Sequence, residues 1–303
     1  MATNLLAPGH TACLGCGEAL AARLVVNAAG PSTIIAEATG CLEIISSRYP
    51  ESAWNVPWIH SLFDNTAAVA AGIAAALRAT GREGQVNVLS QGGDGATADI
   101  GFGPLSGAWE RGHDVLYVCY DNEAYMNTGI QRSGLTPFHA RTSTSPPGRQ
   151  SLGNPTLKKD LPAIAVAHGV PYVATTSVGW PRDIERKVKK ALSIRGPKYL
   201  QIHVPCPLGW GFDPSQTVDL AKLAVSSGLY PIFEYENGIL TGSMKVKPVP
   251  VEEYLKRQVR FRHLFAAAKP ELEEQVRAIQ AVADANLVKY QMVTPPAEAP
   301  TGA

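Results

Sequence analysis

The sequence predicts an α/β fold in which a mostly parallel sheet is covered by helices on both faces. The apolar stretch QVNVL is followed by GGDG, by a helical pattern over residues 98–111 and by the very apolar VLYVCYD. Helical and strand-like patterns alternate again over DLPAIAVAHG, VPYVATTSV, PRDIERKVKKALSI and PKYLQIHVPCP. The chain of 303 residues, 45% of them hydrophobic, is long enough to bury a large core. Consecutive βαβ units of this kind place their strands parallel.

The N-terminal part begins with a cysteine-bearing loop, PGHTACLGCG, which is followed by a predicted helix over residues 18–28. STIIAEATGC indicates a short buried strand, and an irregular, aromatic-rich stretch follows over residues 54–58. DNTAAVAAGIAAALRATG predicts a helix that Asp64 or Asn65 caps and that Gly81 ends.

The second half contains a long segment without periodicity, residues 131–159, which is rich in Ser, Thr, Pro, Gly and Arg. A loop of this length inside a folded domain is usually functional or disordered. From residue 248 onward, EEYLKRQVRFRHLF and PELEEQVRAIQAVADANLVKY predict two amphipathic helices. The tail PPAEAPTGA is expected to be disordered.

The composition excludes several functional classes. The 27 basic and 26 acidic residues give a net charge of +1, so no global basic field is available to bind nucleic acid or an anionic membrane. No apolar run approaches the roughly 20 residues that span a bilayer. The N-terminus MATNLLAPGH lacks the features of a signal peptide, so we expect a cytoplasmic protein. Five cysteines are too few and too unevenly spaced for a disulfide framework.

A first group of residues points to a bound diphosphate. The glycines of GGDG let backbone amides approach phosphate oxygens at the end of a strand, and Asp94 sits in that turn. Asn122 follows Asp94 by 28 residues and ends the next strand, in DNEAYMNTG. Both loops open at the carboxyl edge of a parallel sheet, and their oxygen atoms suit Mg²⁺. The spacing of GDG and Asn is the thiamine diphosphate signature.

Two other interpretations of these residues were considered. GGDG could be a plain tight turn that ends a strand, but the matching DNEAYMNTG at the right distance disfavours this. A nicotinamide site is also disfavoured, because the G-x-G-x-x-G spacing is absent and no acidic residue ends a second strand about 20 residues further on.

A second group consists of cysteines from separated loops. Cys13 and Cys16 form a C-x-x-C, Cys41 follows in ATGC, and Cys206 lies in VPCP. Four thiolates can hold a [4Fe–4S] cluster or a Zn²⁺ ion, and the residues themselves leave both open. Cys119 lies in LYVCYD and is interpreted as a buried strand residue without a ligand role.

Together the two groups carry a family resemblance. Residues 8–264 resemble the β subunit of the 2-oxoacid:ferredoxin oxidoreductases, most closely the pyruvate branch. The matching stretches are PGHTACLGCGEA, ATGCLEIISSRYP, WNVPWIHSLFDN, GGDGATADIGFGPLSGA, DNEAYMNTG, KKDLPAIAVAHG, HVPCPLGW and VEEYLKRQVRFRHLF. The resemblance implies the thiamine diphosphate-binding fold of the diphosphate type, a Cys-rich N-terminal loop and a C-terminal helical extension.

The resemblance also implies roles for individual residues. Asn127 would lie near the substrate as the catalytic residue, although it could also be a turn residue before Gly129. Glu18 would lie against the cofactor, although an acid at a helix start is also favoured by the helix dipole. The implied [4Fe–4S] ligands are Cys13, Cys16, Cys41 and Cys206, and the implied Mg²⁺ ligands are Asp94, Asn122 and the carbonyl of Ala124. The implied cofactor-binding residues are Glu18, Cys41, Gly93, Asp94, Gly95, Ala96, Asn122, Glu123, Ala124, Tyr125 and Asn127.

The activity implied by the resemblance is the oxidative decarboxylation of a 2-oxoacid, first of all pyruvate, with coenzyme A to acyl-CoA, CO₂ and reduced ferredoxin. Branched-chain 2-oxoacids, oxalate and aryl glyoxylates are alternatives, and so is a non-catalytic iron–sulfur or zinc subunit. An α subunit would supply the domain that faces the aminopyrimidine ring. The further partners implied are γ and ferredoxin-like δ subunits. The loop 131–160 would cover the active site, contact coenzyme A phosphates or a partner, or be a solvated basic surface.

We therefore expect four regions. Residues 1–60 form a cluster-binding segment packed on the main domain, and residues 61–245 form the thiamine diphosphate-binding domain. Residues 246–292 form the helical extension, and residues 293–303 form a disordered tail.

Overall fold

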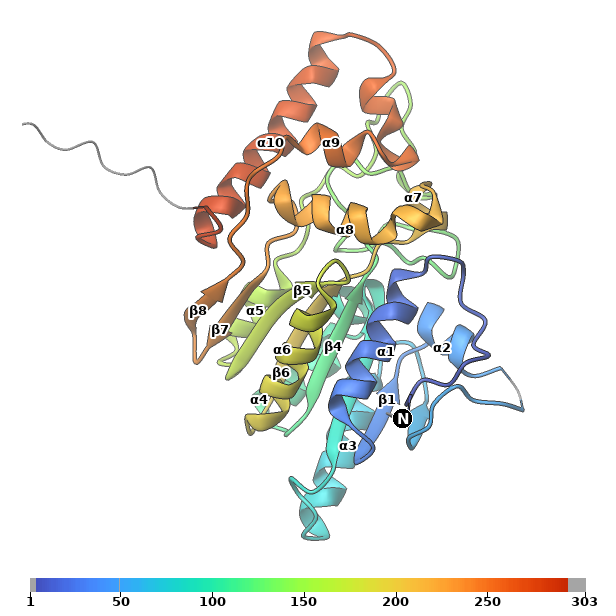
Figure 1. Cartoon of the computed structure of the whole chain (residues 1–303), viewed down its shortest axis with the longest axis vertical. Coiled ribbons are helices and arrows are strands. Elements are labelled where there is room, and N and C mark those ends of the chain that lie inside the picture. Colours follow the sequence, from blue (N-terminus) through green and yellow to red (C-terminus); the bar gives the residue numbers. More distant parts are fainter. Residues whose placement is uncertain (1–3, 49, 294–303) are drawn as a thin grey trace, which may run out of the picture.

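A sheet of eight strands forms the centre of the computed structural model, which describes residues 4–48 and 50–293 (Figure 1). The strand order in the described part is β2-β1-β3-β4-β6-β5-β7-β8. The first six strands in this order run parallel, and β7 and β8 add an antiparallel hairpin at one edge. The strands are β1 Thr33–Glu37, β2 Trp58–His60, β3 Asn87–Gly93, β4 Leu116–Asp121, β5 Tyr172–Ser177, β6 Lys198–His203, β7 Phe233–Glu236 and β8 Ile239–Ser243.

Helices cover both faces of this sheet. On one face lie α1 (Gly17–Ala29) and α6 (Pro181–Ser193), and on the other lie α3 (Thr66–Ala79), α4 (Phe102–Glu110) and α5 (Leu161–Ala167). The fold class that the sequence predicts is therefore confirmed.

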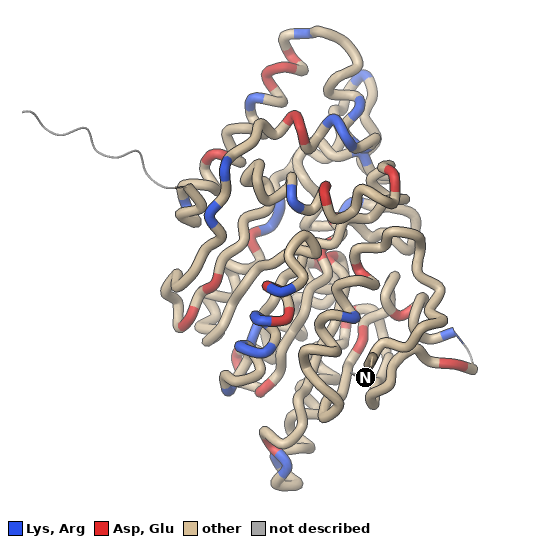
Figure 2. Tube along the Cα trace, viewed as in Figure 1, with Lys and Arg blue, Asp and Glu red and all other residues tan. Residues whose placement is uncertain are grey.

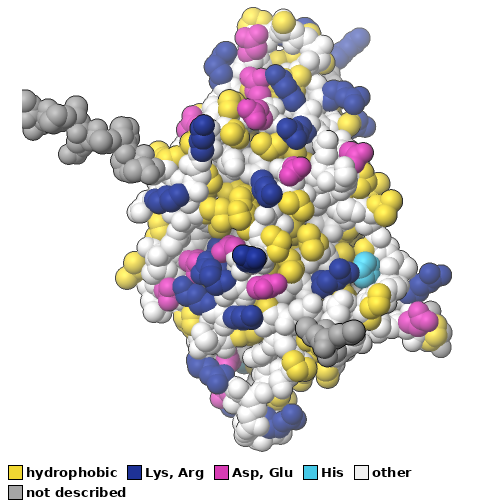
Figure 3. Space-filling model, in the orientation of Figure 1, with side chains coloured by type: hydrophobic (Ala, Val, Ile, Leu, Met, Phe, Trp, Pro, Cys, Tyr) yellow, Lys and Arg dark blue, Asp and Glu magenta, His cyan; other side chains and the backbone are white. Residues whose placement is uncertain are grey.

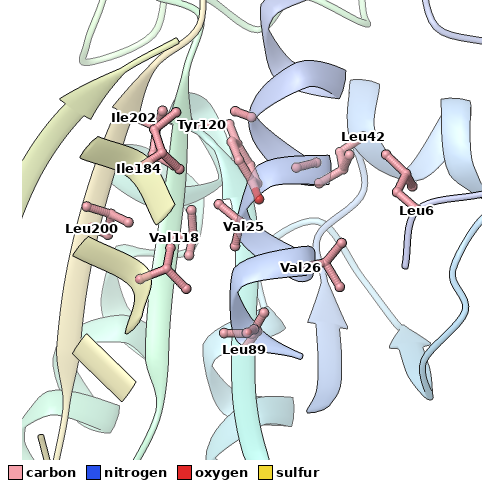
Figure 4. Packing of buried hydrophobic residues seen from close by; sticks show 14 of the residues in the cluster. Leu6, Val25, Val26, Leu42, Leu89, Val118, Tyr120, Ile184, Leu200 and Ile202 are labelled. Atoms are coloured by element: carbon pink, nitrogen blue, oxygen red, sulfur yellow. The ribbon is translucent and has the colours of Figure 1, made fainter. Parts of the chain in front are cut away.

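Strand β4 shows how the sequence creates two cores. Alternate residues of a strand point to opposite faces, so Val118 and Tyr120 pack with α1 and α6 while Tyr117 and Cys119 pack with α3, α4 and α5. Figure 4 shows Tyr120 and Val118 of the first core between the sheet and the helix residues Val25 and Ile184. All six residues of β4 are buried, which explains the continuous apolar run in this strand.

The outer side of α6 carries many charged side chains. Its residues Ile184, Val188 and Ala191 face the core, and its Lys, Arg, Asp and Glu residues appear as alternating blue and red in Figure 2. Figure 3 shows these charged side chains on the surface, with hydrophobic side chains gathered between them and the region of α8 (Thr217–Ser226).

The C-terminal residues form a separate layer above the carboxyl edge of the sheet (Figure 1). Instead of the first of two expected amphipathic helices, the chain forms α9 (Val251–Leu255) and a 3₁₀ helix, η3 (Val259–Phe265). The helix is interrupted because Gln258 is extended (φ −124°, ψ 128°), which turns Arg260 inward to bond its side chain. The second expected helix is α10 (Pro270–Lys289), and residues 294–303 of the expected tail lie outside the described part.

Several short elements have no clear signal in the sequence. These are α2 (Cys41–Ser46), α7 (Pro207–Trp210), a 3₁₀ turn η2 (Pro214–Gln216), the strand β2 and the β7–β8 hairpin. The helix expected over residues 98–111 is divided into a π-helical turn, η1 (Ala96–Ile100), and α4. Of the helices in the described part, none is long and apolar enough to cross a membrane. The region boundaries stay predictions, although β1 and β2 of the first region join the same sheet as β3.

Candidate functional site

Asp94 follows the last residue of β3 and is completely buried. Its Oδ2 accepts a short hydrogen bond from the hydroxyl of Ser133, while its Oδ1 has no hydrogen-bond partner. Burial, together with the nearby charge of Asp121, raises the pKa of the Asp94 carboxyl well above its usual range. A buried carboxylate oxygen without a partner is costly, so a ligand of positive charge would stabilise this arrangement.

Asn122 follows the last residue of the neighbouring strand β4. Its Nδ2 donates to Oε2 of Glu18 at 3.2 Å, and its backbone carbonyl accepts from Trp210 Nε1 at 2.8 Å. Its side-chain oxygen Oδ1 is buried and has no partner. Two oxygen atoms without partners, one of Asp94 and one of Asn122, therefore follow adjacent parallel strands at the same edge of the sheet.

The glycines of GGDG serve two purposes. A Cβ atom on Gly93 would meet nothing within 4 Å, so open space adjoins the end of β3. A Cβ atom on Gly95 would lie 2.4 Å from the ring of Tyr125, so only glycine allows this ring to cover the turn. The hydroxyl of Tyr125 donates to Asp99 at 3.0 Å and holds the ring there. The buried Ala96 then begins η1.

These residues fit a diphosphate and a hard divalent cation. Mg²⁺ prefers carboxylate, amide and carbonyl oxygens and commonly keeps phosphate oxygens among its ligands. Asp94 and Asn122 offer unpartnered oxygens, Ala124 is buried beside them in the chain, and Gly93 leaves space for a phosphate group.

Glu123 is buried between Asn122 and Ala124 and has a left-handed backbone, with φ of 69°. Burial alone would raise its pKa, but Lys158 and Arg260 outweigh this effect and lower the pKa to about 2. Its carboxylate lies 2.8 Å from Lys158 Nζ and 2.5 Å from Arg260 Nη2. Lys158 also contacts Asp121 at 2.9 Å. Residues 122–125, which we call the metal loop after the oxygen ligands that it could offer, are thus anchored from behind by the buried Arg260 and the partly exposed Lys158.

Three of the four cysteines singled out by the sequence lie at the start of a helix. Cys16 caps α1, and its sulfur accepts from the amide of Ala19 at 3.5 Å. Cys206 caps α7, and its sulfur accepts from the amide of Gly209 at 3.3 Å. Cys41 is the first residue of α2. The two N–H groups favour negative charge on the sulfurs of Cys16 and Cys206, but burial outweighs them and raises the pKa of both thiols.

Backbone contacts bring the C-x-x-C loop to the segment of Cys206. The amide of Gly17 donates to the carbonyl of Pro205 at 3.3 Å, and Thr217 Oγ1 donates to the carbonyl of Gly15 at 2.6 Å. A Cβ atom on Gly17 would lie 2.8 Å from the Pro205 carbonyl oxygen, so the glycine after Cys16 permits this approach.

The cysteines influence one another electrostatically. Burial raises the pKa of Cys16 to about 12, with further contributions from Glu18 and Cys206. Burial also raises the pKa of Cys41, with contributions from Glu18 and from the three other cysteines of the set. Among the residues that the structure describes, no three His, Cys, Asp or Glu side chains are arranged to hold a single metal ion. Cys13 is exposed, whereas Cys119 is buried in the core on the α3 side of the sheet.

Glu18 lies between the two groups of residues. It is buried in the first turn of α1, bonds Asn122 and acts electrostatically on Cys16, Cys41 and Cys206. Burial raises its pKa to about 7, and the bond from Asn122 lowers it in part. Asn127, in contrast, is exposed in the turn that follows Tyr125, so the structure does not bring it among the buried groups.

The loop 131–160 supplies residues that sequence reasoning did not assign to the site. Ser133 bonds Asp94, Lys158 bonds Glu123, and Lys159 lies 3.2 Å from Asp99. Arg260 and Trp210 were also not identified. The only signal in the sequence was the Lys158–Lys159 pair in a loop without periodicity, since a lone Ser or Arg in such a context indicates nothing specific.

A cavity of about 270 Å³ lies behind the metal loop, beneath the C-terminal layer. Its lining includes Glu123 and Lys158 but neither Asp94 nor any of the cysteines, and it is mostly aromatic and aliphatic. It is therefore a different space from the one beside Gly93.

Comparison with known proteins places this site in a class. Residues 38–202 match the family described as thiamine pyrophosphate enzyme, C-terminal TPP binding domain. The matched region contains both strands that lead to Asp94 and Asn122, and it also contains Cys41. The thiamine diphosphate-binding domain expected from the sequence is confirmed.

The chain is also similar to individual proteins over nearly its whole length. It is 57% identical to the pyruvate synthase subunit PorB of Methanosarcina barkeri, over 94% of this chain and 96% of that protein. It is 46% identical to PorB of Pyrococcus horikoshii, over 89% of each chain. The chain therefore belongs to the family of pyruvate synthase subunits PorB, within the thiamine pyrophosphate enzymes. The resemblance to β subunits of 2-oxoacid:ferredoxin oxidoreductases is confirmed.

Two further relatives widen the comparison. The ketoisovalerate oxidoreductase subunit VorB of Pyrococcus abyssi is 47% identical, over 84% of this chain and 85% of that protein. Among solved structures, the 2-oxoglutarate:ferredoxin oxidoreductase from Magnetococcus marinus matches with a TM-score of 0.57 and 22% identity, over 86% of this chain and 93% of that chain. At this identity the solved structure supports the fold alone.

Proposed function

We propose that this chain is the β subunit of a thiamine diphosphate-dependent pyruvate:ferredoxin oxidoreductase. The enzyme would convert pyruvate and coenzyme A to acetyl-CoA and CO₂ and pass the electrons to ferredoxin. The observation that carries the proposal is the pair of buried, unpartnered oxygens of Asp94 and Asn122 at one sheet edge. The PorB relatives support the choice of pyruvate.

In this proposal, Mg²⁺ is held by the side chains of Asp94 and Asn122 and by the carbonyl of Ala124. Gly93, Gly95 and Ala96 surround the diphosphate, and Glu123 and Tyr125 shape the loop around it. When bound, thiamine diphosphate supplies an electron sink for the decarboxylation of a 2-oxoacid. Ser133 and Glu18 keep the two metal-binding side chains in orientation through their hydrogen bonds.

Two residues would act closer to the reacting groups. Glu18 has a pKa raised to about 7, so its carboxyl can exchange a proton near neutral pH beside Asn122. Asn127 is exposed in the turn after the metal loop, where an incoming substrate can reach its amide. We assign it to substrate contact.

We further propose that Cys13, Cys16, Cys41 and Cys206 bind one [4Fe–4S] cluster. The helix starts at three of these residues would stabilise the negative sulfur ligands. Such a cluster would supply one-electron redox chemistry, which the proposed transfer of electrons to ferredoxin requires. The competing assignment is a Cys₄ zinc site in a subunit without catalysis.

A partner chain is needed to complete the site. One diphosphate-type unit is present, and the facing domain with its carboxylate would come from an α subunit, with γ and δ subunits carrying electrons onward. Leu14 and Leu208, beside the cysteines in the sequence, are 83% and 71% exposed and would be covered in such a complex. A cytoplasmic location, where ferredoxin is available, stays part of the proposal.

A branched-chain 2-oxoacid is the second candidate substrate. The VorB relatives support it, since their identity to this chain is comparable with that of the PorB of Pyrococcus horikoshii.

The test is anaerobic co-purification of the chain with its partner subunits, followed by cofactor analysis and assay. We expect thiamine diphosphate on denaturation, four iron and four sulfide per chain beyond those of the partners, and ferredoxin reduction with coenzyme A and pyruvate. 2-Oxoisovalerate and 2-oxoglutarate serve as the comparison substrates, and the isolated chain is expected to be inactive. A colourless zinc protein without thiamine diphosphate would contradict the proposal.

A further inference from the structure

We propose that Arg260 is a positioning residue that holds the metal loop against helix α7, which Cys206 begins. The proposal rests on the proposed function, because it takes Asn122 and Cys206 as members of the two cofactor sites. Arg260 belongs to η3 in the C-terminal layer, far along the chain from both. It is 4% exposed, which is unusual for an arginine and requires that its charge be paired.

The first contact of Arg260 is with the metal loop. Its Nη2 lies 2.5 Å from Oε2 of Glu123, and its Nε donates to Oε1 of Gln258 at 2.7 Å. The second bond fixes the plane of the guanidinium group, since Gln258 is itself buried and bonded to the carbonyl of Tyr254. A planar group with several fixed donors gives a directional contact that a lysine cannot reproduce.

The second contact is with α7. The guanidinium carbon of Arg260 lies 3.8 Å from the ring centre of Trp210, and the same ring donates from Nε1 to the carbonyl of Asn122 at 2.8 Å. The arginine therefore stacks on the side chain that holds the backbone of a proposed metal ligand. Stacking of this kind is strongest where both groups are removed from water, as they are here.

Helix α7 also approaches the residue that follows the metal loop. A Cβ atom on Gly209 would lie 2.3 Å from the sulfur of Met126, directly after the metal loop, and 3.4 Å from the sulfur of Cys206. The four-residue helix is thus packed between the loop and the proposed cluster. A shift of Trp210 would move both the carbonyl of Asn122 and the helix start at Cys206.

The conformation of the metal loop makes this support necessary. Glu123 is not glycine, yet its backbone is left-handed, and such a conformation persists only where the surroundings determine it. Lys158 is the other strong cation at this carboxylate, and it is shared with Asp121. His203, at 4.0 Å, is held neutral because burial lowers its pKa to about 3. Without Arg260, the buried carboxylate of Glu123 would keep only Lys158 as a close charged partner, and it shares that lysine with Asp121.

The test compares Arg260→Lys and Arg260→Leu with the control variants Arg262→Lys and Arg262→Leu. Arg262 lies in the same 3₁₀ helix as Arg260, but its side chain is exposed. Each variant is purified in the complete complex and titrated with thiamine diphosphate at fixed Mg²⁺. The reduced cluster is recorded by electron paramagnetic resonance on the same samples. We expect Arg260→Lys to weaken thiamine diphosphate binding between about 10-fold and 100-fold, as for other residues that orient metal ligands.

The same Arg260→Lys samples should show a changed cluster spectrum, while their melting temperature stays close to that of the wild type. The Arg262 variants should match the wild type in all three measurements. Wild-type affinity in Arg260→Lys and Arg260→Leu would overturn the proposal. An unchanged cluster spectrum together with weakened binding would overturn the link through α7. If the wild-type complex binds neither cofactor, the proposed function fails first, which the unmutated control reveals.

Discussion

Two regions at the carboxyl edge of the sheet are built in opposite ways: the proposed Mg²⁺ site, which we call the metal edge, and the proposed cluster site, which we call the cluster rim. The metal edge consists of Asp94 and the metal loop, which follow two adjacent strands and are buried except for the partly exposed Tyr125. The cluster rim consists of Cys13, Cys16, Cys41 and Cys206, which come from three distant segments and are exposed or partly exposed.

The two regions also differ in how charge is compensated. Behind the metal edge, the buried Asp121, Glu123 and Arg260 and the partly exposed Lys158 form ion pairs through their side chains. The cluster rim relies on backbone N–H groups at helix starts. A hard cation needs oxygens fixed within a rigid shell, whereas thiolates need only moderate polarity and a path for electrons to leave.

The largest effect of a single substitution is expected on cluster content, at the cluster rim. Cys206→Ala should abolish the cluster, because it removes one of four proposed ligands. Iron and acid-labile sulfide content and visible absorbance of the purified complex measure this. Cys119→Ala, on the other face of the sheet, is the matched control and should keep the full iron content. Loss of the cluster in both variants would contradict the division of the cysteines.

The corresponding change at the metal edge is Asp94→Asn. Mutation of a residue that only orients a metal ligand typically lowers metal affinity by about 10- to 100-fold. Loss of the charge of the ligand itself should therefore weaken Mg²⁺-dependent thiamine diphosphate binding by about 100-fold or more. The melting temperature without cofactors should not fall, because burial already raises the pKa of this carboxyl. Calorimetric titration measures the affinity, with the exposed Asp213→Asn as control. Undiminished binding would remove Asp94 from the site.

Two neighbouring lysines allow the importance of buried charge to be measured. Lys158→Met leaves the buried carboxylates of Asp121 and Glu123 with one cation fewer and should cost about 3–5 kcal/mol of unfolding free energy. Lys159→Met breaks a pair with Asp99 that is partly exposed to water and should cost less than about 1 kcal/mol. Chemical unfolding of the two variants is the measurement, and equal losses would contradict the contrast between them.

Glu37 beneath the cluster rim predicts a pH dependence. It is buried, accepts from Trp54 Nε1 at 3.1 Å and contacts Ser46 of α2, and burial raises its pKa from 4.5 to about 8. Since the folded state binds this proton more tightly, the contribution to stability is complete below pH 4.5 and is lost as pH rises toward 8. Between pH 5 and 8 the loss should reach up to about 4 kcal/mol.

Glu37→Gln should remove the Glu37 part of this dependence and leave the smaller part that comes from the raised pKa of Glu18, while the control Glu51→Gln keeps the whole dependence, as measured by unfolding at pH 5, 6.5 and 8. The hypothesis fails if wild type and Glu37→Gln lose stability equally over that range.

The smallest effect on the chain itself is expected at the exposed leucines. Leu14→Ser with Leu208→Ser should change the unfolding free energy by less than about 0.5 kcal/mol per site, because both side chains are already in water. Association with the partner subunit should nevertheless weaken, and sedimentation measures this association. Normal assembly would show that this surface is not covered in the complex.

The same contrast explains what the sequence could predict. The metal edge follows from local rules, since an apolar strand, a glycine turn and a second apolar strand place Asp94 and Asn122 at one edge. The four cysteines could be grouped from the sequence, but only the resemblance favoured an iron–sulfur cluster over zinc. How C-x-x-C and VPCP approach each other could not be predicted, because it depends on long-range contacts such as Gly17 to Pro205. Arg260 was interpreted as part of an amphipathic helix, since nothing local reveals that Gln258 is extended and turns the arginine inward.

The register of β4 on β6 has a consequence for electron flow. Asp121 pairs with His203, so the metal loop and the segment of Cys206 leave the sheet from neighbouring strands at the same level. Adjacent strands are about 4.8 Å apart, and a slip of one residue would turn each side chain to the opposite face. In the proposed enzyme, the separation between the metal loop and the segment of Cys206, which electrons would have to cross, would therefore be set by the backbone hydrogen bonds of two strands. This separation should tolerate changes in the surrounding loops.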